Sequence, residues 1–162
     1  AYIFGDQLYL THLGDSRAYL IRNGAITCLS NDHTIVGDMV RSRLIPPSAI
    51  RTHERRSILT RAVGMELFVT PDISIHRLLA GDRLILCSDG VWSVLEDEEI
   101  NEIAGKIKNT QQLASDLVNS AIGRESDDNC SAVIADFQYF RPLSVPQSEI
   151  PRRKWLGFMD RS

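Results

Sequence analysis

The feature that most constrains this chain is a short apolar run that ends in a polar turn. The run from Leu84 to Cys87 is apolar throughout and is followed at once by Ser88, Asp89 and Gly90. Such a run without polar alternation is typical of a strand buried on both faces. The strand fixes the direction of the carboxylate and the glycine permits a tight turn, so Asp89 is well placed to bind a hard metal ion. Aspartate is also a favoured helix cap, which is the more common role for a single residue of this kind.

Length and charge exclude several classes of protein. The 162 residues are enough for one domain, or most of one, and the net charge of -3 implies no general attraction to nucleic acid or anionic lipid. Cys28, Cys87 and Cys130 show no CxxC spacing, so we expect buried thiols in a reducing compartment and a cytoplasmic protein. No apolar run approaches the length of a transmembrane segment, so none is predicted.

Turn signals and hydrophobic spacing divide the chain into short elements. Strands are predicted at 1–4, 7–13, 18–22, 25–30, 58–63, 73–78, 84–87 and 132–135, and helices at 34–43, 48–52, 91–95, 97–106 and 110–123. We expect the first four strands to form one antiparallel meander, with the Gly14-Asp15-Ser16 turn as a tight reversal at its edge.

The character of the sequence changes after residue 140. Pro142, Pro146 and Pro151 preclude regular structure, and the basic-aromatic stretch 152–155 follows them. We therefore predict a folded portion at 1–140 and a proline-containing basic tail or linker at 141–162. A solvated linker is the favoured interpretation of this tail, and a juxtamembrane segment is the alternative.

Three carboxylates occupy comparable places at strand ends. Asp15 lies at a strand reversal, Asp89 ends one buried strand, and Asp128 precedes another apolar strand. If the last two strands are antiparallel neighbours, Asp89 and Asp128 share one edge of the sheet, and Asp15 joins them if it turns at that edge. Carboxylates gathered in this way repel one another, and a divalent cation with oxygen ligands, Mg²⁺ or Mn²⁺, resolves the repulsion. Paired metals would activate a water for phosphoryl displacement.

Four blocks of the sequence together resemble one known family, the type 2C metal-dependent serine/threonine protein phosphatases, and the bacterial branch in particular. Each block alone is weak, but their order and spacing agree over roughly residues 1–137. The blocks are Gly14-Asp15-Ser16-Arg17-Ala18-Tyr19-Leu20 with Asn23-Gly24 and Asp32-His33, Leu59-Thr60-Arg61-Ala62-Val63-Gly64, Gly81-Asp82 through Ser88-Asp89-Gly90, and Asp128-Asn129-Cys130-Ser131-Ala132-Val133.

The resemblance implies an α+β fold, an antiparallel β-sandwich flanked by helices, and hydrolysis of phosphoserine and phosphothreonine by a metal-activated water. It implies that Asp89 and Asp128 are catalytic metal ligands, with Asp89 contacting more than one of two Mn²⁺ or Mg²⁺ ions. Asp15 would help Asp89 to hold a third, more weakly bound ion. The implied partners are phosphorylated protein substrates, and the phosphatase would oppose a serine/threonine kinase in signalling.

The resemblance also implies a mobile flap beside the active site, at about residues 35–57. This segment is basic, and Arg41, Arg43 and Arg55 are candidates for attracting a phosphorylated substrate. A solvated basic face explains the same arginines equally well.

The family's Asp-Gly-x-Gly-Gly block is not found in these 162 residues. It would precede Ala1, so we expect a fold that is incomplete at its N-terminus and a chain that is inactive alone. Two alternatives follow: a non-catalytic binding module derived from a phosphatase, or a phosphohydrolase of small molecules that uses the same carboxylates.

Overall fold

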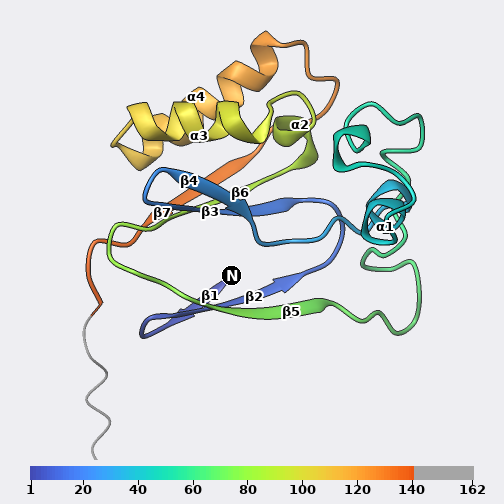
Figure 1. Cartoon of the computed structure of the whole chain (residues 1–162), viewed down its shortest axis with the longest axis horizontal. Helices are drawn as coiled ribbons and strands as arrows, with labels where there is room; N and C mark the ends of the chain where they lie inside the picture. The colour runs from blue at the N-terminus through green and yellow to red at the C-terminus, as the bar shows by residue number, and fades with distance from the viewer. Residues whose placement is uncertain (141–162) are drawn as a thin grey trace, which may run out of the picture.

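Two antiparallel sheets stack on each other in the computed structural model, which describes residues 1–140 (Figure 1). The three-stranded sheet has the order β1 (Tyr2–Phe4), β2 (Gln7–His12), β5 (Asp72–Arg77). The four-stranded sheet has the order β4 (Ala25–Cys28), β3 (Arg17–Arg22), β6 (Arg83–Cys87), β7 (Ala132–Asp136). The predicted tail, 141–162, lies outside the described residues.

Helices cover only one of the two sheets in this part of the chain. α2 (Asp89–Trp92), α3 (Asp97–Lys106) and α4 (Thr110–Gly123) lie over the outer face of the four-stranded sheet, and α1 (Ile35–Arg41) lies at one end of the sandwich (Figure 1). A single 3-10 turn, Pro47–Ala49, follows α1. Within residues 1–140, no helix combines the length and apolar character needed to cross a bilayer.

The apolar run of β6 supplies both layers of the core, as predicted. Ile85 and Cys87 face the helices, where they join a cluster of buried side chains that includes Trp92 and Leu117. Leu84 faces the other way and packs with Leu8, Leu20 and Leu78 between the sheets. The run lacks polar alternation because each face of β6 is covered, by helices on one side and by β2 on the other. The structure therefore confirms the antiparallel sandwich with flanking helices.

The prediction of one continuous meander is wrong. β2 pairs with β5, whereas β3 pairs with β4 and β6, so the chain crosses from one sheet to the other between His12 and Arg17. The reason is burial, since Ala18, Tyr19 and Leu20 are all buried and an interior strand needs cover on both faces. Leu8 and Leu20 thus meet face to face between the sheets.

Several local predictions also need correction. The segment 58–63 forms no strand: Leu59 makes an isolated bridge with Thr34, and the chain then turns, with Val63 fully in solvent. Its apolar residues have no sheet face to cover, so strand propensity alone does not order them. α2 begins at Asp89, earlier than predicted, and Cys28 is exposed rather than buried.

Candidate functional site

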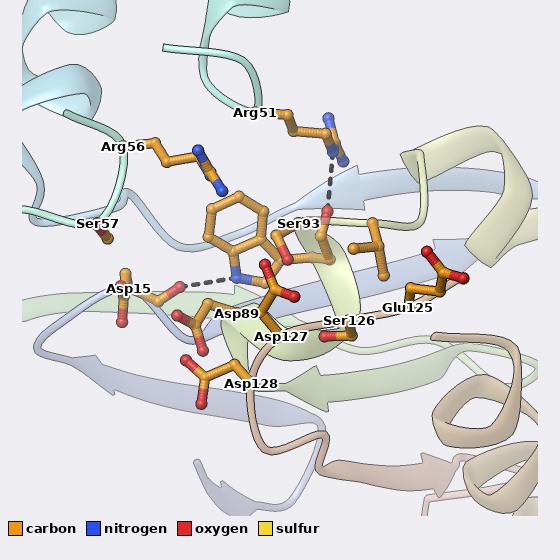
Figure 2. A pocket seen from close by; sticks show the side chains of 12 residues that line it. Asp15, Arg51, Arg56, Ser57, Asp89, Ser93, Glu125, Ser126, Asp127 and Asp128 are labelled. Atoms are coloured by element: carbon orange, nitrogen blue, oxygen red, sulfur yellow. Dashed lines mark hydrogen bonds between the residues drawn. The ribbon is translucent and has the colours of Figure 1, made fainter. Parts of the chain in front are cut away.

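The structure brings the three predicted carboxylates, Asp15, Asp89 and Asp128, into one pocket of about 210 Å³. A fourth acid, Asp127, lines the same pocket. Figure 2 shows the four acidic side chains close together, and Trp92 also lines this pocket. The acids come from three separate parts of the chain, so the pocket exists only in the folded protein.

The pairing of β6 with β7 places Asp89 next to Asp128. Cys87 lies opposite Ala132, so the end of β6 is beside the beginning of β7, as the sequence predicted. Ser88 reinforces this junction, because its Oγ donates to the carbonyl of Asn129 at 2.9 Å and accepts from the amide of Ser131 at 3.0 Å.

Asp15 is held through its own backbone and that of Gly14. His12 Nε2 lies 3.0 Å from the carbonyl oxygen of Gly14, and the Gly14 amide donates to Nδ1 of the fully buried His33 at 3.2 Å. The indole Nε1 of Trp92 donates to the carbonyl oxygen of Asp15 at 2.9 Å. The turn therefore has structural histidines on one side and the pocket wall on the other.

Electrostatics inside the pocket favour a bound cation. Burial raises the pKa of Asp15, and the nearby charges of Asp89 and Asp128 raise it further. A set of aspartate oxygens without histidine or cysteine suits Mg²⁺ or Mn²⁺. Within residues 1–140, no three acidic, histidine or cysteine side chains converge closely enough to enclose an ion. Mg²⁺ commonly binds through one or two carboxylates and retained waters, so the donor set fits such an ion.

Asp89 does not occupy the helix-cap position that the sequence offered as the alternative to a metal site. Ser88 occupies the N-cap position of α2 and Asp89 is the first helical residue. The Gly90 amide donates to Asp89 Oδ1 at 2.9 Å. The cap interpretation is therefore wrong by one residue, because α2 begins at Asp89 itself, and the second oxygen of Asp89 has no hydrogen bond in the described structure that would keep it from an ion.

The structure does not bring the predicted substrate-binding arginines, Arg41, Arg43 and Arg55, to the pocket lining. Arg41 pairs with Asp38 of its own helix and donates to the carbonyl of Asp32, which precedes the helix, at 2.8 Å. Arg43 is exposed after the end of α1, with a φ of 57°. Arg55 is exposed and lies 3.9 Å from Glu54.

Two other arginines of the same segment line the pocket instead. Arg56 and Arg51 both lie on the side of the pocket opposite the acids (Figure 2). Sequence reasoning missed both because no periodic pattern orients side chains in this segment. Asp127 was also missed, although its position beside Asp128 was a signal that the whole acidic turn faces the pocket.

Comparison with known proteins assigns the family. A sequence model described as "Protein phosphatase 2C" matches residues 1–130. This match covers most of the chain, so the chain belongs to the protein phosphatase 2C family, as the four sequence blocks predicted.

Individual relatives agree with this assignment. The serine/threonine protein phosphatase PstP of Mycobacterium tuberculosis is 38% identical over 133 residues, which are 82% of this chain and 25% of that protein. The structure of Stp1 from Staphylococcus aureus is similar with a TM-score of 0.81 and 31% identity, covering 85% of this chain and 54% of the other. The structure of the PstP catalytic domain in complex with two manganese ions is similar with a TM-score of 0.74 and 34% identity, over 85% of this chain and 56% of that domain.

The relatives are longer than the matched region. The chain spans about half the length of the curated serine/threonine phosphatase of Listeria monocytogenes, 52%, and a quarter of PstP. The match therefore establishes the family of this chain, and it covers only a part of each of these relatives.

Proposed function

We propose that the protein is a metal-dependent phosphatase that hydrolyses phosphoserine and phosphothreonine in other proteins. The observation that carries this proposal is the pocket that Asp15, Asp89 and Asp128 line together. Carboxylates at the ends of two adjoining strands and one crossing turn can hold divalent ions on a rigid frame. The names of the relatives, which are serine/threonine phosphatases, support the same reaction.

Each residue of the pocket has a proposed task. Asp89 and Asp128 would hold a pair of Mn²⁺ or Mg²⁺ ions, and Asp15 would help Asp89 to hold a third. When bound, these ions would lower the pKa of a water and offset phosphate charge. Arg56 is exposed and lies across the pocket from the acids, where it would attract the phosphate dianion of the substrate. Trp92 keeps the Asp15 turn in place.

Phosphate release from a phosphothreonine peptide tests the proposal, using the protein as its gene encodes it and Mn²⁺ as the ion. We expect Asp89→Asn to lower kcat/KM on the order of 100-fold or more, because a metal ligand loses its charge. Chelation of Mn²⁺ is expected to stop the reaction of the unmodified protein. The matched control is Asp116→Asn on α4, whose carboxylate accepts from Gln112 at 2.7 Å and is not part of the pocket. Full activity of Asp89→Asn would show that Asp89 is not a ligand of the catalytic ions.

Substrate class is tested with the same preparation. Turnover of phosphopeptides and of small phosphoesters is compared at equal Mn²⁺ concentration. We expect the peptides to be preferred, since an open pocket with a basic rim gives a flanking peptide surface to contact. Preference for small phosphoesters would instead support the small-molecule phosphohydrolase.

A non-catalytic binding module is the second candidate. It is favoured by one observation, that no three ligating side chains converge on a point within residues 1–140. Calorimetric titration of the 162-residue chain with Mn²⁺ separates the two. We expect weak binding if these residues supply only part of the ligand set, and tight binding of two ions would contradict that expectation.

Three further features belong to the proposal. The phosphatase portion would end near residue 140, which is supported by the end of β7 at Asp136 and of the family match at residue 130. The partners would be phosphoproteins modified by a serine/threonine kinase. A cytoplasmic location would suit the three cysteines, which are all free thiols.

A further inference from the structure

The segment from Ser42 to Thr60 needs an anchor to stay beside the pocket. Apart from the 3-10 turn Pro47–Ala49 it has no helix or strand, yet it supplies Arg51, Arg56 and Ser57 to the pocket lining. Backbone bonds hold its end, where the Thr60 amide donates to the His33 carbonyl at 2.8 Å. We call residues 42–60 the flap segment.

Arg51 is the polar anchor in the middle of the flap segment. Its Nε donates to the Trp92 carbonyl at 2.8 Å, and its Nη2 donates to the Leu95 carbonyl at 3.3 Å. These carbonyls lie at and beyond the C-terminus of α2, where backbone acceptors lack helical partners. The same guanidinium lies 2.9 Å from Glu96 and 2.7 Å from Asp97. Only 16% of the Arg51 side chain is exposed, so these contacts are largely shielded from water.

The ion pair with Asp97 continues inward to the centre of the four-stranded sheet. Asp97 Oδ1 accepts from Arg51 and also from the hydroxyl of Tyr19, at 3.0 Å. Burial raises the pKa of Tyr19 above its ordinary value of 10.0, so at neutral pH its hydroxyl is protonated and can donate. Arg17 in turn donates to the Tyr19 hydroxyl at 3.1 Å and forms a bidentate pair with Asp32, at 3.0 and 2.7 Å.

The same cluster reaches the turn that carries Asp15. The guanidinium of Arg17 lies 3.7 Å from the centre of the Trp92 ring, and the Trp92 indole donates to the Asp15 carbonyl. Trp92 is therefore contacted by Arg51 at its backbone, by Arg17 at its ring face and by Asp15 at its ring nitrogen. Trp92 therefore supports both the flap segment and the turn that carries Asp15.

We propose that Arg51 is a positioning residue that fixes the flap segment over the carboxylate pocket. A lysine cannot replace it fully, because one ammonium cannot reach two carbonyls and two carboxylates as the planar fork does. Ile50 also packs against the core, so the apolar contact remains when the guanidinium is removed. Loss of Arg51 should loosen the flap segment, because its polar contacts with α2 and α3 are lost, without unfolding the sheets.

Hydrogen exchange of the full protein, followed by mass spectrometry, tests this directly. In Arg51→Met, which keeps the apolar stem, we expect exchange of residues 42–60 to rise at least about tenfold while the exchange of β3 and β6 is unchanged. The matched control is Arg77→Met, which removes an arginine and its 2.9 Å pair with Asp6 from the exposed end of β5. This control should leave the flap segment unchanged. Equal exchange of the flap segment in Arg51→Met and the unmodified protein would overturn the proposal.

Milder variants keep the test decisive if Arg51→Met does not fold. Arg51→Lys keeps the charge but not the fork, and Glu96→Gln removes only the more exposed carboxylate of the two. Both should raise exchange in the same residues by a smaller factor, and no rise in either would refute the positioning role.

A kinetic test of the same variant is also possible, and it depends on the proposed phosphatase function. With a phosphopeptide, Arg51→Met should raise KM about three- to tenfold and change kcat by less than about twofold, because substrate contacts on the rim are lost first. A loss confined to kcat would contradict the assignment to the flap segment. If exchange rises but no preparation hydrolyses phosphopeptide, the phosphatase proposal fails and the positioning role stands.

Discussion

At the edge of the carboxylate pocket, Gly90 lies so close to Asn129 that no side chain fits between them. A Cβ at position 90 would lie 2.6 Å from the Asn129 carbonyl oxygen, which is rigid backbone rather than a flexible side chain. The glycine is therefore required by the close approach of the Asp89 and Asp128 turns, and not by an unusual φ.

Gly90→Ala is expected to destabilise the fold by about 1–3 kcal/mol, because the Asn129 backbone must move to admit the methyl group. The measurement is urea unfolding followed by circular dichroism. Gly105→Ala is the matched control, since nothing lies within 4 Å of a Cβ at that position in α3. Alanine is the better helix former, so this control should be neutral or stabilising by up to about 1 kcal/mol. Equal stability of Gly90→Ala and the unmodified protein would contradict the contact.

At the scale of elements, one buried aspartate joins the turn before β6 to two other strands. Asp82 is 2% exposed and accepts from Arg22 of β3 at 2.8 and 2.7 Å, and from the Leu79 amide at 2.7 Å. Its backbone pairs with Phe137 after β7, since the Phe137 amide donates to the Asp82 carbonyl at 2.9 Å. The pKa of Asp82 is lowered, and the main cause is its hydrogen bonding to Arg22.

Asp82→Asn should cost about 1–3 kcal/mol of unfolding free energy at pH 7, because the pair with the partly exposed Arg22 is lost. A lowered folded-state pKa means that the stabilisation is fully present above the ordinary value of 3.8 and is lost as the pH falls through the lower folded value. Urea titrations at pH 7 and near pH 2 should therefore show the gap between the two proteins shrinking in acid. An undiminished gap at low pH would rule out ionisation of Asp82 as its source.

For the whole molecule, the two sheets differ in what covers them. In residues 1–140 the outer face of the three-stranded sheet carries exposed Tyr2, Ile73 and Ile75, with exposed fractions of 64%, 70% and 58%. Tyr2 and Ile75 are both in register with Tyr9, so they form one row across the sheet. A contiguous apolar row of this kind favours association.

We expect the 162-residue chain to self-associate with increasing concentration, and the double variant Ile73→Thr/Ile75→Thr to weaken association at least about tenfold. Sedimentation velocity over a concentration series measures this. Val133→Thr is the matched control, because Val133 is equally exposed at 62% but lies on β7 of the other sheet. Association that responds equally to both changes would place the contact elsewhere.

Local patterns were sufficient to predict much of this protein. The unbroken run Leu84 to Cys87 predicted a strand covered on both sides, and the structure places helices on one side and a sheet on the other. Residues 97–106 and 110–123 are helical within the predicted bounds. Such features are local because period, caps and turn residues act over a few neighbours. The four short blocks likewise predicted the family that residues 1–130 match.

Only the tertiary structure decided which sheet each strand joins and which charges line the pocket. β2 lies with β5 and β3 with β6, so paired residues are at least sixty positions apart and local signals cannot choose between them. Arg51 and Arg56 reach the pocket while Arg43 and Arg55 do not, because the flap segment has no regular period, and Arg51 is oriented by its contacts with α2 and α3. Short-range chemistry therefore determines the helices and strands. The partners of each charged side chain depend instead on how distant segments of the chain pack together.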